Sequence, residues 1–257
     1  MSLYKELGKQ LFDALNSGQS IGPLRALIDN DIDAAYAIQK ELVTLRKASG
    51  EKVVGKKIGL TSFAVQKQLG VDQPDYGILF DSMDVSRSKS IDSSKLILPK
   101  VEGELAFILG KDITTKNITM DVLMDAIGQV RASIEVVDSR VEDWNIQISD
   151  TIADNASGSH FILGEDSKSL NELNPETVSM KLYKNGKLSS EGNGRACMDN
   201  PLNAALWLAQ KMNNQGEPLC KGEVLLSGAL GPMVSVIKGD DIRMDMGGFA
   251  SIHLTIN

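Results

Sequence analysis

Apolar residues in the first fifty positions recur with the spacing of α-helices. Four leucines follow one another at intervals of four and so stay near one stripe of a helix: Leu3, Leu7, Leu11 and Leu15. Gly18 follows as a stop signal. The same period recurs from Asp33 to Gly50 and predicts a second helix. Two helices this short bury too little surface for an independent core, so we predict a small helical N-terminal region over residues 1–50.

From Val53 onward the pattern changes to short strands. Runs rich in Val, Ile and Leu are separated by Gly, Pro, Asp and Ser, as is typical of strands joined by turns. The clearest runs are VVGKKIGL, ILFDSMDV, ILPKVEGELAFIL and ASIEVVDS, followed near the C-terminus by GEVLLSG, MVSVIKGD and FASIHLTI. A helical segment is predicted at about residues 120–130, between the third and fourth of these runs.

Two local signals punctuate the last third of the chain. Asn185-Gly186 lies between alternating polar and apolar runs, which is a strong signal for a β-hairpin. Asn200 followed by Pro201 predicts the start of a helix that ends before Gly216. Many strands and few crossover helices favour a mostly antiparallel or mixed sheet layered on itself. We therefore predict an α+β chain in which residues 51–257 form one large unit.

Composition and charge exclude several classes of protein. The chain has 27 basic and 34 acidic residues, a net charge of −7, whereas a nucleic-acid binder needs a basic face. Cys197 and Cys220 are too few for a disulfide framework or a cysteine-rich zinc site, and they fit a reducing compartment. No apolar run approaches the roughly 20 residues of a membrane helix, and the N-terminus lacks the apolar core of a signal peptide. We predict a cytoplasmic protein whose partners are small molecules or copies of itself, not nucleic acid or membrane.

The most informative stretch runs from Pro99 to Leu109 and holds two glutamates in a strand pattern. Because side chains alternate along a strand, Glu102 and Glu104 fall on one face and the large apolar residues on the other. Their Cα atoms are then about 6.5–7 Å apart, so the two carboxylates can converge on one point. Like charges at this distance repel unless a cation lies between them or one carboxyl holds a proton.

A third acid, Glu135, lies inside the apolar run SIEVV, where an unpaired charge is costly. Three carboxylates from two strands form an oxygen-rich site that suits Mg²⁺ or Mn²⁺ better than zinc. The simpler alternative is that Glu102 and Glu104 lie on a solvated sheet face and that Glu135 pairs with a lysine. Spacing alone does not decide between these two interpretations.

Two further residues are candidates for proton chemistry. Lys57, in VVGKKIGLT, is available as an acid, a base or a partner for an anion if it points inward. Lys56 points the opposite way, so at least one of the two is expected at the surface. Asp75, in QPDYG, has the default interpretation of a turn residue, because Pro-Asp-x-Gly is typical turn chemistry.

Blocks over nearly the whole chain resemble those of one known family, in the same order. They are GKKIGLTSFAVQKQLGVDQPDYGILFDSM, PKVEGELAFIL, SIEVVDSRVEDWNIQISDTIADNAS, NPLNAALWLAQKM and GEVLLSGALGPMVSV. Together they resemble the 2-keto-4-pentenoate hydratases (2-hydroxypenta-2,4-dienoate hydratases) of the fumarylacetoacetate-hydrolase-like superfamily, which act in the meta-cleavage catabolism of aromatic compounds. The resemblance implies a mixed β-sandwich roll with a small helical N-terminal region. It also implies homo-oligomers, often pentamers or decamers.

The resemblance further implies roles for individual residues. The three metal-binding carboxylates of the family fall on Glu102, Glu104 and Glu135. Lys57 and Asp75 match two residues that are expected at the active site. Ser157, in DNAS, matches a serine that holds a substrate oxygen or a water.

The implied activity is metal-dependent addition of water to 2-hydroxypenta-2,4-dienoate (2-oxopent-4-enoate). The product is 4-hydroxy-2-oxopentanoate, and the enzyme class is hydro-lyase. Two alternatives stay open: a 2-oxo-3-hexenedioate (4-oxalocrotonate) decarboxylase, which shares the metal and lysine blocks, and a non-catalytic oligomer that binds α-keto acids. We expect neither a serine or thiol hydrolase nor a dinucleotide-binding enzyme, because Gly192-Asn193-Gly194 lacks the last glycine of G-x-G-x-x-G and neither cysteine has motif context.

Overall fold

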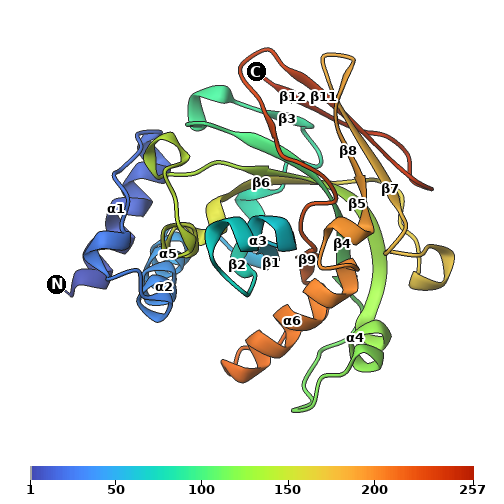
Figure 1. Cartoon of the computed structure of the whole chain (residues 1–257), viewed down its shortest axis with the longest axis horizontal. Helices are drawn as coiled ribbons and strands as arrows, with labels where there is room; N and C mark the ends of the chain where they lie inside the picture. Colours follow the sequence, from blue (N-terminus) through green and yellow to red (C-terminus); the bar gives the residue numbers. More distant parts are fainter. Residues whose placement is uncertain (1) are drawn as a thin grey trace.

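Two β-sheets form the body of the protein, with three helices at one end and others along its edges (Figure 1). The computed structural model describes residues 2–257, apart from the side chains at positions 68 and 69. The larger sheet has the order β2 (Asp75–Phe80), β1 (Val53–Gly59), β9 (Val224–Leu226), β4 (Lys100–Leu109), β5 (Ile127–Val137) and β6 (Gly158–Leu163), with β10 (Val234–Ser235) paired to β4. The smaller sheet has the order β3 (Ser90–Ile91), β12 (Ile252–Ile256), β11 (Asp241–Met246), β7 (Ser179–Lys184) and β8 (Lys187–Asn193).

The α-helices are α1 (Leu3–Ser17), α2 (Ile32–Ala48), α3 (Phe63–Leu69), α4 (Met120–Ala126), α5 (Ile148–Ala153) and α6 (Pro201–Asn214). Figure 1 shows α1, α2 and α5 side by side at one end of the molecule, with α4 and α6 along another edge. Among residues 2–257, no helix has both the length and the apolar character needed to traverse a bilayer.

The two faces of β4 have different partners, as its alternating sequence predicts. Its odd-numbered side chains, among them Leu105 and Phe107, are fully buried in the main core. Gly103 lies on this face, and a Cβ there would come within 2.7 Å of atoms of Met180 on β7 and Met244 on β11. The missing side chain therefore lets the second sheet pack closely behind β4. The other face carries Glu102 and Glu104 and faces the site described below.

The helical N-terminal region is tied to the sheet through α5. Apolar side chains of α1, α2 and α5 share one cluster that includes Leu7, Leu11, Ile38, Leu42 and Ile152. The buried carboxylate of Asp150 accepts hydrogen bonds from the backbone N–H groups of Leu24 (2.7 Å) and Arg25 (2.8 Å), and the Arg25 guanidinium donates to its second oxygen at 2.8 Å. The Gln39 amide on α2 donates to the carbonyl groups of Tyr76 (2.8 Å) and Ile152 (3.1 Å). The division at residues 50 and 51 stays our prediction.

Most of the predicted elements are present, and the α+β class with a helical N-terminal region is confirmed. Helix α1 ends at Gly18 in the left-handed conformation (φ 68°), and Asn200 caps α6 through the N–H of Leu202. Asn185-Gly186 forms the turn between β7 and β8. The predicted helix at 120–130 was too long, since it ends at Ala126 and β5 begins at Ile127. The sequence analysis missed five elements that are seven residues or shorter, namely β3, β6, β11, α3 and α5.

Candidate metal and substrate site

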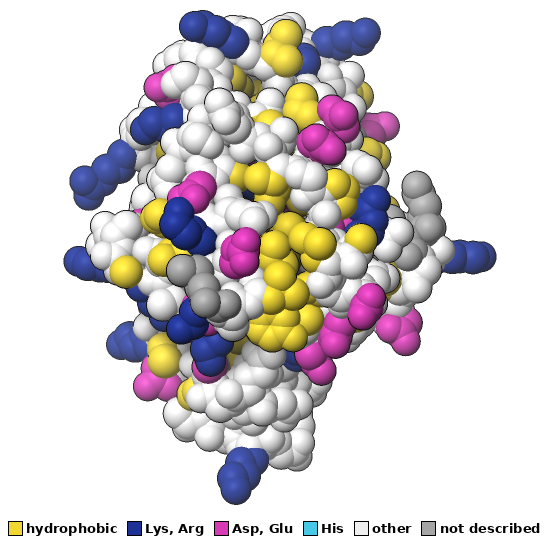
Figure 2. Space-filling view, turned by 90° about the vertical axis from the view of Figure 1, so that its left-hand side faces the viewer, with side chains coloured by type: hydrophobic (Ala, Val, Ile, Leu, Met, Phe, Trp, Pro, Cys, Tyr) yellow, Lys and Arg dark blue, Asp and Glu magenta, His cyan; other side chains and the backbone are white. Residues whose placement is uncertain are grey.

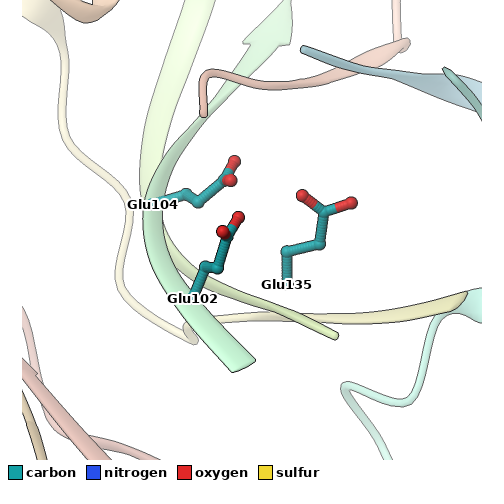
Figure 3. Close-up of side chains that lie close together, drawn as sticks. All are labelled: Glu102, Glu104 and Glu135. Carbon is teal, nitrogen blue, oxygen red and sulfur yellow. The ribbon is translucent and has the colours of Figure 1, made fainter. Parts of the chain in front are cut away.

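Three glutamate side chains converge beside the larger sheet. Glu102 and Glu104 lie on the same face of β4, and the antiparallel pairing of β4 with β5 places Glu135 directly opposite Glu102. Figure 3 shows the three carboxylates turned toward one another. One carboxylate oxygen of each residue lies within 4.8 Å of the others. The alternation of side chains along β4 thus positions two of these carboxylates, and the register between β4 and β5 positions the third.

These carboxylates are removed from solvent to different extents and are poorly satisfied. Glu104 is 0% exposed, which excludes a solvated sheet face for it, Glu135 is 1% exposed, and Glu102 is half-buried. The backbone N–H of Gly228 donates to one oxygen of Glu104 at 2.9 Å, while its other oxygen has no hydrogen-bond partner among the described residues. Within the same part of the chain neither oxygen of Glu135 accepts a hydrogen bond, although one of them forms an ion pair with Lys57. Buried carboxylate oxygens without partners are costly, so this donor set fits a group that brings positive charge.

Lys57 supplies only part of that charge. Its ammonium, buried on β1, lies 3.3 Å from Glu135 and donates a hydrogen bond to the carbonyl of Ala156 at 3.1 Å. Burial alone would lower the pKa of Lys57, but the surrounding carboxylates, Glu135 foremost and then Asp75, raise it above its ordinary value. Lys57 is therefore an ammonium at neutral pH. One lysine faces three glutamates, and an oxygen-only donor set of this kind suits a hard divalent cation.

Burial and the neighbouring charges also raise the pKa values of the three glutamates. Burial, followed by the charge of Glu135, raises the pKa of Glu102 to about 7. Burial and the same neighbours raise the pKa of Glu104 well above its ordinary value. The pKa of Glu135 is also raised by burial, although Lys57 opposes the shift. In the absence of a cation, the cluster therefore holds protons that a metal has to displace.

This competition predicts a pH-dependent affinity for Mg²⁺. Glu102 is largely protonated at pH 6 and largely ionised at pH 8, because its pKa is about 7. We expect the Kd for Mg²⁺, measured by titration calorimetry, to weaken by about tenfold per pH unit for each proton displaced below pH 7. The heat should also depend on the ionisation enthalpy of the buffer. An affinity for Mg²⁺ that is constant from pH 6 to pH 8 would contradict a site built on these carboxylates.

The same shifts fix how stability depends on pH in metal-free protein. A carboxyl whose pKa rises on folding binds more protons in the native state, so the free energy of unfolding falls as pH rises through the two pKa values. For Glu102 this window extends from 4.5 to about 7. We expect Mg²⁺ to raise the Tm more at pH 8 than at pH 5 in a thermal-unfolding scan. A larger gain at pH 5 would show that the cation binds elsewhere.

Asp75 is part of the same buried group and not a turn residue. It is the first residue of β2 and is 1% exposed. The Thr151 hydroxyl donates to one oxygen at 3.0 Å, and the other oxygen has no hydrogen-bond partner. Burial raises the pKa of Asp75, while Lys57 and Thr151 act in the opposite direction. The default interpretation from the Pro-Asp-x-Gly pattern was therefore wrong for this residue.

Gly59 makes room for the pair of Lys57 and Asp75. A Cβ at position 59 would overlap one oxygen of Asp75 and lie 3.3 Å from the ammonium of Lys57. We expect Gly59→Ala to displace the Asp75 carboxylate and lower kcat by about a hundredfold in a dienol hydration assay, with the fold retained. Gly22→Ala is the matched control, because nothing lies within 4 Å of a Cβ at that position. Equal rates in the two variants would remove Asp75 from the site.

Ser157 lies in an unusual turn that lines the pocket. Asn155, Ala156 and Ser157 all have left-handed backbone angles (φ 55°, 50° and 51°), which non-glycine residues rarely adopt. The Ser157 hydroxyl donates to Asp154 at 3.3 Å. Asp154 in turn forms a buried ion pair with Arg140, whose guanidinium also donates to backbone carbonyl groups on both sides of the turn. The ion pair therefore holds the turn whose carbonyl group contacts Lys57.

Four of the six predicted residues line one pocket of about 500 Å³. Lys57, Asp75, Glu102 and Ser157 lie on its wall, together with Thr151, Lys100 and Trp144. The remaining lining is largely apolar and includes Leu60, Val65, Ile146, Ala196, Ala229 and Met233. The pocket lining thus combines charged and apolar side chains, which suits an organic acid with a small apolar tail.

The sequence analysis missed several residues of this site. Arg140, Asp154 and Thr151 support the Ser157 turn and Asp75, and all three lie in the block SIEVVDSRVEDWNIQISDTIADNAS, which was their only signal. Gly228 has φ +104°, and a Cβ there would overlap Thr61, so only glycine places this N–H against Glu104. The glycine-rich block GALGPMV is the signal that could have identified it.

The expectation about Lys56 needs correction, and the structure excludes a role for one further motif. Lys56 is not a surface lysine: it is 5% exposed and forms an ion pair with Glu223 at 2.7 Å. The chain also contains the G-x-S-x-G spacing of a hydrolase nucleophile elbow, at residues 18–22. Ser20 is exposed there and follows helix α1, whereas the elbow requires a turn from a strand into a helix. This segment is therefore no nucleophile elbow.

Comparison with known proteins agrees with the fold. The family model for the fumarylacetoacetate (FAA) hydrolase C-terminal region matches residues 62–257. A 2-keto-4-pentenoate hydratase of Burkholderia vietnamiensis is 47% identical over 250 residues, which cover 97% of this chain and 95% of the relative. A 2-hydroxyhexa-2,4-dienoate hydratase of Comamonas testosteroni is 40% identical over 256 residues, which cover 96% of both chains.

A solved structure adds a similar fold at lower identity. The 4-oxalocrotonate decarboxylase of Pseudomonas putida G7, complexed with magnesium and adipate, has a TM-score of 0.95 and 31% identity, with 99% of this chain and 97% of that chain covered. The fold and the carboxylate cluster define a class of α+β proteins with an acidic, metal-compatible pocket. The chain belongs to the fumarylacetoacetate hydrolase family, among the 2-keto-4-pentenoate hydratases.

Proposed function

We propose that the protein is a metal-dependent hydratase that adds water to 2-hydroxypenta-2,4-dienoate and forms 4-hydroxy-2-oxopentanoate. The observation that carries this proposal is the cluster of three converging glutamates, two of them fully buried, beside Lys57 and Asp75, at a pocket that Glu102 lines together with apolar side chains. The relatives named hydratases, at up to 47% identity over nearly the full chain, support the same reaction. The place in metabolism that follows is the meta-cleavage catabolism of aromatic compounds.

We assign the cation to Glu102, Glu104 and Glu135. Oxygen-only ligands favour Mg²⁺ or Mn²⁺, and the similar decarboxylase structure holds magnesium. When bound, the cation would act as a Lewis acid toward the oxygens of the α-keto acid. Glu102 of this ligand set lies on the pocket wall, so the keto acid group would bind beside it and the tail would extend along the apolar side chains of the lining.

Lys57 and Asp75 are the proposed proton-transfer residues. Lys57 enters as an ammonium, because the surrounding carboxylates raise its pKa, and it donates a proton to C5 of the dienol. Asp75 has one free carboxylate oxygen and accepts a proton from the water that adds at C4. Ser157, held by Asp154, positions the substrate oxygen or this water. The proton of the C2 hydroxyl returns to Lys57 as the 2-oxo-3-enoate forms, and Asp75 passes the proton taken from the water to C3. The steps therefore restore both residues and consume one water and no other reactant, as a hydratase requires.

Product analysis separates this function from its alternatives. The dienol loses its ultraviolet absorbance when it is hydrated, and mass spectrometry detects the gain of one water. With 2-oxo-3-hexenedioate as substrate, a decarboxylase would instead release carbon dioxide. A ligand that binds with Mg²⁺ but is recovered unchanged would overturn the hydratase assignment and leave the binding protein. Loss of carbon dioxide at a rate above hydration would favour the decarboxylase.

We also propose that the protein forms a homo-oligomer, a pentamer or decamer, in the cytoplasm. Figure 2 shows hydrophobic side chains gathered in the middle of the face on the helical side, among charged ones. On the N-terminal elements Leu3, Tyr4 and Leu27 are exposed, at 45%, 40% and 55%. Both cysteines are free thiols, in keeping with a reducing compartment. Light scattering coupled to size exclusion tests the assembly, and a monomeric mass would overturn it.

A further inference from the structure

Lys100 is a charged residue of the pocket to which the proposed reaction gives no task. It is the first residue of β4 and shares a face of the strand with Glu102 and Glu104. In the pairing with β5, Lys100 lies opposite Val137, two positions from the pair of Glu102 and Glu135. Lys100 is partly exposed whereas Glu104 is fully buried, so Lys100 lies at the open end of this row of charges.

The surroundings of Lys100 leave its charge unpaired. Its ammonium lies 4.1 Å from the centroid of the Trp144 ring. Over residues 2–257, with the two undescribed side chains set aside, no carboxylate oxygen lies within 4.0 Å of that ammonium, whereas Lys56 and Lys57 each have one. An aromatic face holds a cation from one side only and leaves its other N–H donors free.

The ring beneath Lys100 is fixed in place at some cost to the backbone. The Trp144 indole N–H donates to the carbonyl of Leu98 at 2.8 Å. Trp144 and the preceding Asp143 both have left-handed backbone angles (φ 54° and 57°), which bulky residues rarely adopt. Backbone strain of this kind persists where the surrounding structure over-determines it, and it clusters at ligand-binding sites. The fold therefore holds an aromatic platform under a lysine at the pocket opening.

The net charge of the pocket indicates which kind of ligand Lys100 binds. The three glutamates and Asp75 outweigh Lys57, and a divalent cation would still leave the pocket with an excess of negative charge if all four carboxyls are ionised. The proposed substrate is itself an anion, which such a pocket would repel. Lys100 supplies a further positive charge on the path that the anion takes.

We propose that Lys100 binds the C1 carboxylate of the α-keto acid and thereby determines specificity for anions, an inference that rests on the proposed function. One carboxylate oxygen faces the glutamate cluster, and the other accepts a hydrogen bond from the ammonium of Lys100. The tail of the substrate then lies along the wall of Leu60, Val65 and Ala229. Lys57, which contacts Glu135, is left to the reacting carbon atoms.

Pyruvate is a suitable probe, because its only carboxylate is the one at C1. We expect titration calorimetry at saturating Mg²⁺ to give a Kd for pyruvate that is at least tenfold weaker in Lys100→Met than in the wild type, as for loss of a charged hydrogen bond. Lys100→Arg keeps the charge and should stay within about twofold of the wild type. Lys116→Met removes the same charge from an exposed position outside the pocket and should also stay within about twofold.

A second titration separates Lys100 from the metal site. Removal of a nearby positive charge should leave the Mg²⁺ affinity of Lys100→Met unchanged or tighter, with a circular dichroism spectrum like that of the wild type. If Lys100→Met does not fold, Lys100→Gln repeats the test. The role of Lys100 would be overturned by any of three results for Lys100→Met: an unchanged Kd for pyruvate, an affinity that falls for the diacid adipate but not for pyruvate, or a Mg²⁺ affinity that falls as much as the pyruvate affinity. A wild type that does not bind pyruvate with Mg²⁺ would overturn the proposed function itself.

Discussion

Glu104→Gln is expected to abolish hydration of the dienol, with a loss of kcat of at least about a thousandfold. The substitution keeps the size of a side chain that is 0% exposed but removes its charge. One oxygen of Glu104 accepts the N–H of Gly228, so the amide of glutamine would have to turn its NH₂ group toward the other carboxylates. That group cannot ligate a cation. Turnover of the dienol, followed by ultraviolet absorbance with added Mg²⁺, measures the effect.

Thermal unfolding shows whether the loss comes from the site and not from the fold. The pKa of Glu104 is raised well above its ordinary value, so its ionised form destabilises the metal-free protein at pH 8. Glu104→Gln should therefore match or exceed the wild-type Tm in chelator, and Mg²⁺ should no longer raise it. Glu191→Gln, at an exposed position on β8, is the control and should behave as the wild type. Normal turnover in Glu104→Gln would refute the metal assignment.

Lys57→Met is expected to keep the cation and lose the reaction, by about a thousandfold in kcat. Methionine fills a similar volume but donates no proton. It also frees Glu135 from its 3.3 Å contact with the ammonium, so Mg²⁺ should bind at least as tightly as before. Stopped-flow rates and calorimetric titration with Mg²⁺ measure the two effects separately.

The neighbouring Lys56 offers a closely matched comparison. It is equally buried on β1 but points to the other face, where it pairs with Glu223. We expect Lys56→Met to lower the Tm, because an unpaired glutamate is left behind, and to retain kcat within about a few fold. A comparable loss of rate in both variants would mean that Lys57 acts through the stability of β1 and not through proton transfer.

Elements whose signal is local were predictable from the sequence. Helix α1 follows from leucine spacing and Gly18, and the hairpin from Asn185-Gly186. The alternation along β4 placed Glu102 and Glu104 together on one face. Each of these depends on interactions between residues a few positions apart, which composition and period describe.

Features that depend on strand register and on pairing between distant residues could not be predicted from the sequence. That Glu135 lies opposite Glu102 follows from the alignment of β4 with β5, which no single strand encodes. The error about Lys56 has the same origin, since its partner Glu223 is 167 positions away and is brought near by the parallel pairing of β1 with β9. The left-handed turn at residues 155–157 contains no glycine that would indicate this conformation in the sequence. A buried ion pair between the distant residues Arg140 and Asp154 supports it.

The hydrogen bonds of Asp150 have a consequence for engineering. Asp150 accepts two backbone N–H groups and a guanidinium from the N-terminal region, and the next residue, Thr151, donates to Asp75. A chimera that exchanges the first fifty residues with those of a relative would thus change the position of α5 and, through Thr151, the orientation of Asp75. Such an exchange would alter the rate of the reaction as well as the packing of the helices.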